Sequence, residues 1–258
     1  MVGAHASFTL SEDTLAGCVD LARSAEVGIH IHVAEDLADQ GDAQARFGRP
    51  VVERLEEAGV VTDLALLAHC VHLHPSEIGL VEASGAAVAH NPRSNMNNRV
   101  GRAAAAALGD RVVLGTDGID GDMFAESKAA YWRAREAGDP VSPQWVLDRL
   151  AESSRLAGRK FGEPQLGRIE AGAPADLVVL DYDPPTPLTA ENLAGHWMFG
   201  IGANHVRDVF VAGERVVRDR RLASVDGADL AARCREYSGR LWERLDATAA
   251  HPFQPKGE

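Results

Sequence analysis

Residues 28–35 restrict the fold more than any other segment, because polar and apolar side chains alternate there. Residues 29–33 read Ile-His-Ile-His-Val, which is the two-residue period of a β-strand with one apolar face and one imidazole face. Glu35 follows where this strand is expected to end. Because buried imidazole and carboxylate groups need hydrogen bonds, charged partners or a metal, the segment predicts a strand that ends in a polar site.

The composition allows a large core and argues against a nucleic-acid partner. The chain has 258 residues, 45% of them hydrophobic, which is enough for one large domain or for a domain and part of another. It contains 26 Lys and Arg against 38 Asp and Glu, for a net charge of −12. Since nucleic-acid binding needs a basic surface, we predict a small-molecule substrate and no nucleic-acid partner.

The sequence shows no sign of export or of a membrane segment. No Lys or Arg precedes Arg23, and no apolar run approaches the roughly 20 residues that a spanning helix needs. The three cysteines are far apart and form no Cys-x-x-Cys pair, so a disulfide framework is not expected. We therefore expect a cytoplasmic protein with no membrane partner.

Strand and helix patterns alternate through the first part of the chain. Apolar runs at residues 64–69, 85–90 and 111–115 are typical of strands that are buried on both faces. No element is predicted for the polar segment 36–48. Such alternation predicts a parallel α/β array. A first helix is predicted between its cap Ser11 and its stop Gly28, and further helices are predicted at residues 50–58, 75–84, 102–108, 123–137 and 142–161.

The pattern changes after residue 162. A strand is predicted at residues 177–180, and residues 209–217 are typical of a hairpin that turns at Ala212-Gly213-Glu214. These strands predict a separate β layer. The chain then forms an amphipathic helix, whose apolar stripe is Leu230, Cys234, Tyr237, Leu241 and Leu245.

Polar side chains gather at the predicted carboxyl ends of the parallel strands, where α/β proteins place their chemistry. Each one alone is weak evidence, because a single His is more often structural and an Asp before Gly is usually a turn residue. Together, imidazole nitrogen and carboxylate oxygen suit zinc or another borderline divalent ion in an open, catalytic site. The candidates are His5, His32, Glu35, His69, His90 and Asp117.

Four motifs stand at or after the predicted strand ends: His32-Val33-Ala34-Glu35, Leu67-Ala68-His69-Cys70, His90-Asn91-Pro92-Arg93-Ser94-Asn95 and Leu114-Gly115-Thr116-Asp117-Gly118. In this order and spacing they resemble the amidohydrolase superfamily, and within it the cytosine deaminase and chlorohydrolase-like branch. Shorter segments near His5, Asn95 and His196 are similar to SsnA-type aminohydrolases.

The resemblance implies a fold in three parts. Residues 1–165 would form a partial (β/α)8 TIM-type barrel, from about the fourth strand to the eighth. Residues 166–225 would form part of a composite β-sandwich domain, and residues 226–258 a C-terminal helix and tail.

The resemblance also implies a metal-dependent aminohydrolase that deaminates an amino-bearing heterocycle such as a purine or pyrimidine derivative. His32 and Asp117 would bind one divalent metal, zinc in first place and iron as the alternative. Asp117 would also accept a proton from the attacking water, Glu35 would transfer protons to the substrate, and His69 would orient the water. No lysine lies at a predicted strand end, so a second, carboxylated-lysine-bridged metal is not expected. His5, His90 and Arg93 would face the substrate.

One part of the family pattern is missing. Its His-x-His pair, which ends the first barrel strand and supplies two metal ligands, has no counterpart before His5. We therefore expect a fragment that lacks an N-terminal segment, or a chain that a separate polypeptide completes. A homo-oligomer is a further possible partner arrangement. The alternatives are a chlorohydrolase or cyclic amidohydrolase with the same site, and a catalytically inactive truncated scaffold.

Overall fold

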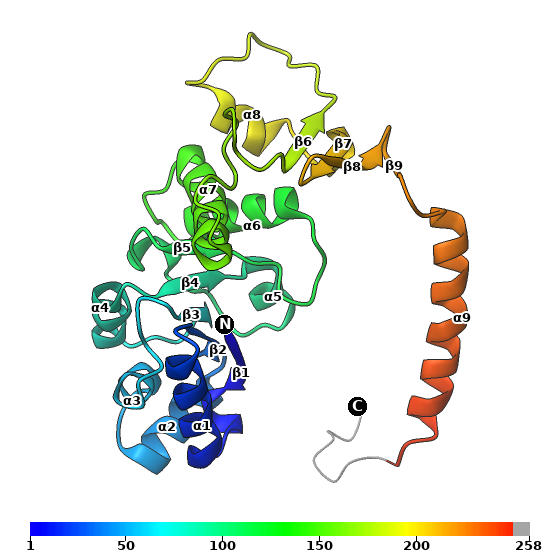
Figure 1. Cartoon of the computed structure of the whole chain (residues 1–258). Coiled ribbons are helices and arrows are strands. Elements are labelled where there is room, and N and C mark those ends of the chain that lie inside the picture. The colour runs from blue at the N-terminus through cyan, green and yellow to red at the C-terminus, as the bar shows by residue number, and fades with distance from the viewer. Residues whose placement is uncertain (250–258) are drawn as a thin grey trace. The chain divides into compact units, whose positions relative to one another are not determined.

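A computed structural model describes residues 1–249 of the chain (Figure 1). The chain forms two compact units. The first comprises Met1–Pro174 and Tyr182–His205, and the second comprises Ala175–Asp181 and, within the described residues, 206–249. The predicted domain limits, which follow the family resemblance, stay a prediction.

A five-stranded parallel sheet forms the centre of the first unit, which confirms the predicted parallel α/β arrangement. The strands follow one another across the sheet in chain order. Among the described residues the two outer strands each pair on one side only, so the sheet is open and does not close into a barrel. The strands are β1 (Val2–Ala6), β2 (Ile29–Val33), β3 (Leu66–His69), β4 (Ala87–His90) and β5 (Val112–Leu114).

Helices connect these strands and continue after β5. Their ends use ordinary capping chemistry: Asp122 accepts backbone hydrogen bonds at the start of α6, and the left-handed Gly85 ends α4. The helices are α1 (Glu12–Ser24), α2 (Leu37–Phe47), α3 (Val51–Glu57), α4 (Pro75–Ser84), α5 (Pro92–Asn97), α6 (Met123–Glu136), α7 (Pro143–Phe161) and α8 (Leu193–Phe199).

Several segments differ from the sequence prediction, among them α5 and α8, which form where no helix was predicted. The helix predicted at residues 102–108 is wrong, because only a 3-10 turn forms at Ala105–Ala107. The alanines favour a helix, but so short a segment gains too few hydrogen bonds to offset nucleation. The polar segment 36–48, conversely, contains α2. Asp36 caps this helix by accepting from Ala38 N at 2.9 Å, and Gly48 ends it with a φ of 69°.

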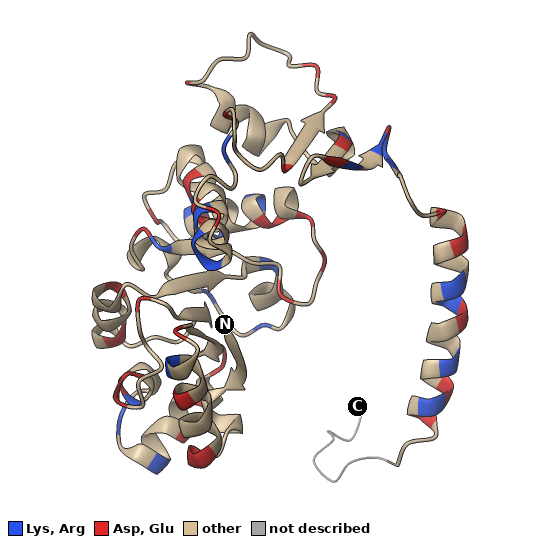
Figure 2. Ribbon diagram, viewed as in Figure 1, with Lys and Arg blue, Asp and Glu red and all other residues tan. Residues whose placement is uncertain are grey.

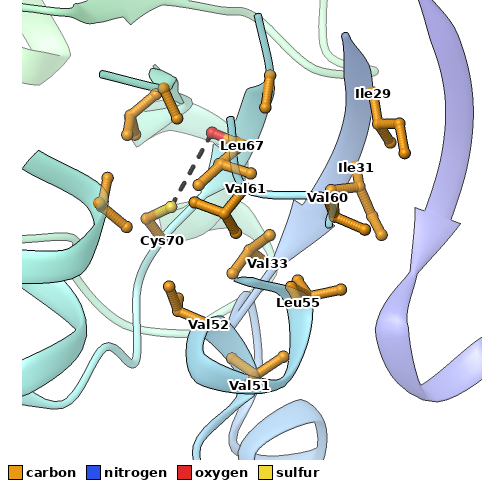
Figure 3. Close-up of a cluster of buried hydrophobic side chains, with 14 of the residues drawn as sticks. Ile29, Ile31, Val33, Val51, Val52, Leu55, Val60, Val61, Leu67 and Cys70 are labelled. Atoms are coloured by element: carbon orange, nitrogen blue, oxygen red, sulfur yellow. Dashed lines mark hydrogen bonds between the residues drawn. The ribbon is translucent and has the colours of Figure 1, made fainter. Parts of the chain in front are cut away.

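The apolar face of β2 packs against a helix layer, which confirms the predicted alternation. Ile31 and Val33 are fully buried, whereas His30 on the other face is exposed. Figure 3 shows the β2 side chains beside Val52 and Leu55 of α3. The five strands contain no Lys, Arg, Asp or Glu, and Figure 2 shows the charges on the surrounding helices and loops. The imidazoles of β2 are therefore on the face that looks away from this core.

The second unit contains a four-stranded antiparallel sheet and a long helix. The predicted hairpin is confirmed, since β7 and β8 are antiparallel and Val211 pairs with Glu214. The carboxylate of Asp208 is buried and contacts Arg207 and Arg215. The elements are β6 (Leu177–Leu180), β7 (Val206–Val211), β8 (Glu214–Arg218), β9 (Arg221–Leu222) and α9 (Gly227–Asp246).

None of the helices in residues 1–249 combines the length and the apolar character that crossing a membrane requires.

Candidate active site

The candidate residues lie at one edge of the parallel sheet because the strands that carry them end side by side. Val33 at the end of β2 pairs with His69 at the end of β3, and His90 at the end of β4 pairs with Leu114 at the end of β5. Glu35 follows β2 by two residues, and Asp117 follows β5 by three. The register therefore places these side chains at the same edge of the sheet.

The backbone is strained at the same strand ends. Ala34 has a φ of 49°, His69 of 72°, Cys70 of 50° and Asp117 of 50°, all in the left-handed region that favours glycine. Non-glycine residues there cost about 1 to 3 kcal/mol each and are often found at functional sites. The sequence gives no signal for this strain, because none of these positions holds a glycine.

Three side chains converge at the centre of the site. The ligand atoms of His32, Glu35 and His69 all lie within 4.8 Å of one another. Glu35 Oε2 is 3.5 Å from His69 Nε2 and 3.9 Å from His32 Nδ1. The two imidazole rings meet edge to face with their centroids 4.9 Å apart. These contacts join the ends of β2 and β3.

The imidazole of His69 is buried and has a hydrogen-bond partner on one side only. Its side chain is 1% exposed, and its Nδ1 lies 2.9 Å from Asn95 Oδ1. Its Nε2, which faces Glu35, has no hydrogen-bond partner among residues 1–249. A buried ring nitrogen without a partner is costly, so this atom is the best evidence that the site accepts a ligand.

Asp117 is held by the neighbouring helix α5. Its Oδ2 accepts a hydrogen bond from Ser94 Oγ. Burial, with the neighbouring His69, lowers the pKa of His32, while the Glu35 and Asp117 carboxylates act in the opposite direction. A lowered pKa favours the neutral imidazole, which is the form that binds a metal.

The three predicted substrate contacts have different surroundings. The exposed His5 donates to or accepts from Thr9 Oγ1 at 2.9 Å, and its ring lies 5.4 Å from that of His32. His90 is buried, and its Nδ1 has no hydrogen-bond partner among the described residues. Arg93 contacts two carboxylates: Nε donates to Glu126 Oε2 at 2.5 Å, and a terminal nitrogen donates to Asp120 Oδ1 at 2.6 Å. Any substrate contact of Arg93 would compete with these ion pairs.

The residues around the cluster suit a divalent metal. Two imidazoles and a carboxylate converge, and His69 Nε2 has no hydrogen-bond partner within residues 1–249. Nitrogen and oxygen donors of this kind are those that catalytic zinc uses. The donor set therefore fits a metal with His32 as a ligand.

Several polar residues that support the site were not predicted from the sequence. Asp39 of α2 is buried and accepts from Ser7 Oγ at 2.7 Å and from Ala34 N at 2.8 Å, which supports the strained turn before Glu35. Ser94 and Asn95 hold Asp117 and His69. A sequence signal for such supporting residues exists only after β4, where short polar side chains follow the strand directly in the segment His90-Asn91-Pro92-Arg93-Ser94-Asn95.

Acidification should destabilise the protein through His90. Burial, with smaller contributions from Arg102 and His69, lowers the pKa of His90 to about 4. The unfolded chain therefore binds this proton between pH 6.5 and about 4 while the folded chain does not, so stability falls as the pH is lowered through that range. The loss is about 3 kcal/mol at most. Urea unfolding across this range should show a weaker pH dependence in His90→Gln than in the wild type.

The matched control for this titration is His74→Gln, at an exposed position. It should leave the pH dependence of the unfolding free energy unchanged. Equal pH dependence in the wild type and in His90→Gln would show that His90 is not buried in its neutral form.

Comparison with known proteins identifies the family. A profile of the Amidohydrolase family matches residues 1–216. The 5'-deoxyadenosine deaminase of Methanopyrus kandleri is 34% identical over 248 residues, which are 93% of this chain and 57% of that protein. The 5-methylthioadenosine/S-adenosylhomocysteine deaminase of Nitratidesulfovibrio vulgaris is 35% identical and is covered to 56%.

Solved structures show the same fold. An adenosine deaminase from Xanthomonas campestris with bound zinc has a TM-score of 0.83 and 27% identity, and the match covers 93% of this chain and 57% of that one. A variant of the atrazine chlorohydrolase from Arthrobacter aurescens, complexed with zinc and atraton, has a TM-score of 0.74 and 21% identity, with 90% and 53% coverage. The chain thus spans little more than half the length of these proteins, and it belongs to the amidohydrolase family.

Proposed function

We propose that this chain carries the proton-transfer residues and part of the metal site of a zinc-dependent aminohydrolase that deaminates an amino-substituted purine. The observation that carries the proposal is the convergence of His32, Glu35 and His69, with His69 Nε2 free of protein partners in the described residues. The names of the relatives indicate the substrate class, since they are deaminases of adenosine derivatives. The expected cytoplasmic location and the oligomeric state stay predictions.

The finer fold assignment is part of the same proposal. The five parallel strands would be the later strands of a (β/α)8 barrel, and the antiparallel sheet of the second unit would be part of a β-sandwich domain. The open edges of β1 and β5 support this, because a barrel needs further strands to pair with them. The coverage of about half of each relative agrees with it.

In the proposed reaction His32 and Asp117 would hold zinc, which would supply the Lewis acidity that makes water nucleophilic at neutral pH. Asp117 accepts a proton from the attacking water, and His69 Nε2 orients that water through a hydrogen bond. Glu35 delivers a proton to the ring nitrogen next to the carbon under attack. Asp117 then returns its proton to the amino group, the bond from that carbon to the amino nitrogen breaks and ammonia leaves, and Glu35 takes up the hydroxyl proton as the carbonyl group forms.

Ammonia release tests the proposal. The purified chain would be assayed with zinc against 5'-deoxyadenosine, 5-methylthioadenosine, S-adenosylhomocysteine and cytosine. Each assay would be run with the chain alone and with the chain mixed with a second polypeptide, the part of the M. kandleri deaminase that this chain does not match. We expect the mixture to release ammonia from at least one adenosine derivative. Ammonia from none of them would contradict deamination, and chloride release from a chlorinated triazine would indicate a chlorohydrolase instead.

Zinc binding should depend on His32. We expect His32→Ala to bind zinc at least about tenfold more weakly than the wild type, because it removes one of the few protein ligands. Isothermal titration of zinc into the two proteins measures this difference. The control is His30→Ala on the same strand, whose exposed side chain lies outside the cluster and which should bind zinc as the wild type does. Equal affinity in all three proteins would contradict a role for His32 as a ligand.

A further inference from the structure

The His69 ring lies between two asparagine side chains on one side and a carboxylate on the other. Nδ1 is 2.9 Å from Asn95 Oδ1 and 3.4 Å from Asn91 Nδ2. Nε2 is 3.5 Å from Glu35 Oε2. One of the two asparagines therefore determines which ring nitrogen carries the hydrogen, since a carbonyl oxygen accepts and an amide nitrogen donates.

The distances favour Asn95. A separation of 2.9 Å is normal for a hydrogen bond, whereas 3.4 Å lies at the outer limit. The Oδ1 of Asn91 occupies the space where a Cβ on residue 115 would be, which Gly115 leaves open. With the Asn95 amide placed so that Oδ1 faces the ring, His69 donates from Nδ1 to that oxygen, and Asn95 Nδ2 has no hydrogen-bond partner among residues 1–249.

This tautomer has a consequence on the other side of the ring. Nε2 then carries a lone pair and faces Glu35 Oε2 at 3.5 Å. While Glu35 is ionised, these two acceptors need a donor or a cation between them, such as water or substrate. In the opposite tautomer Nε2–H would donate to Glu35 and occupy the carboxylate that must transfer protons.

We propose that Asn95 is a positioning residue that holds His69 in the Nδ1–H tautomer and so keeps both His69 Nε2 and Glu35 available to the substrate and water. The inference rests on the proposed function for its catalytic meaning. Two further observations support it. The Asn95 side chain is 2% exposed, so water does not compete for its oxygen, and its backbone is fixed by the bond from Asn95 N to Asn91 O at 3.0 Å.

Nitrogen-15 NMR of the histidine side chains tests this tautomer without any assay of activity. A ring nitrogen that carries a hydrogen has a different chemical shift from a ring nitrogen that carries none. The His69 signal is assigned by its loss in His69→Gln. We expect the Nδ1–H pattern in the wild type and in Asn95→Asp, which keeps an oxygen acceptor. Asn95→Leu has a similar shape and no acceptor, and it should shift His69 toward the Nε2–H form.

The control is Asn97→Leu, at an exposed position on the same helix, which should leave the His69 signal unchanged. An Nε2–H pattern in the wild type would overturn the proposal even if Asn95→Leu fails to fold. An unchanged Nδ1–H pattern in a folded Asn95→Leu would also overturn it. In the ammonia assay, Asn95→Leu should lower kcat about 10- to 100-fold with little change in KM, and Asn95→Asp should restore most of it. Failure of the deaminase proposal would instead appear as absent ammonia with the NMR pattern intact.

Discussion

Replacing Glu35 by glutamine is expected to lower the rate of deamination by about 10²- to 10⁴-fold, because the amide cannot transfer a proton to the substrate ring. The change keeps the shape of the side chain and one oxygen acceptor. Glu35 Oε2 lies close to both His32 and His69 at the end of β2, which is the position that the proposed proton transfer requires. Steady-state ammonia release from the completed enzyme measures the effect.

Zinc content distinguishes the two possible roles of Glu35. As a proton carrier, Glu35 can be replaced by glutamine with no loss of bound zinc, whereas loss of zinc together with activity would make it a ligand. The matched control is Glu56→Gln on the exposed side of α3, which should change neither quantity. Wild-type turnover by Glu35→Gln would contradict the proposed mechanism.

Removal of the Glu126 side chain should produce the largest loss of stability among the polar contacts around the site. Glu126 is fully buried on α6, accepts from Arg93 N at 3.1 Å and from Arg93 Nε at 2.5 Å, and its pKa is raised by burial. Without it the partly buried Arg93 loses its partner inside the protein. Loss of one member of a buried ion pair typically costs about 3 to 5 kcal/mol, and we expect about 3 for Glu126→Ala because Arg93 keeps some solvent contact.

The same arginine supplies the control. Asp120 binds the outer end of the Arg93 guanidinium at 2.6 Å, but its side chain is 55% exposed. Surface ion pairs contribute about 0 to 1 kcal/mol, so Asp120→Ala should change the unfolding free energy by less than 1 kcal/mol in urea titrations. Equal losses from the two variants would mean that the burial of Glu126 does not determine the strength of the pair.

The strands of the first unit could be predicted from the sequence because their burial, on one face or on both, leaves a pattern of apolar side chains. The alternation in residues 29–33 gave the strand and its apolar face, and continuous apolar runs gave β3, β4 and β5. Parallel strands bring their carboxyl ends to one edge, so the candidates from those ends were expected to meet. The structure brings His32, Glu35 and His69 together in this way, and their chemical roles stay proposals.

The remaining features depend on interactions that a single sequence does not display. Helix α2 carries mostly polar residues, and its two buried side chains, Asp39 and Ala43, leave almost no apolar pattern. The alanine-rich segment 102–108 shows the opposite case, in which good local propensity is too short to form a helix. The contacts of Ser94 and Asn95 link residues more than 20 positions apart, so no local pattern predicts them.

A zinc-edge anomalous difference map of the chain crystallised with zinc tests the central claim most directly. The proposed site predicts a peak about 2.0 to 2.2 Å from a ring nitrogen of His32 and from a carboxylate oxygen of Asp117, at the carboxyl edge of the parallel sheet. The refined structure of the same crystal should place Glu35 near the metal but not bound to it. A peak elsewhere in the chain, with none beside His32, would contradict the metal site and with it the proposed deaminase chemistry.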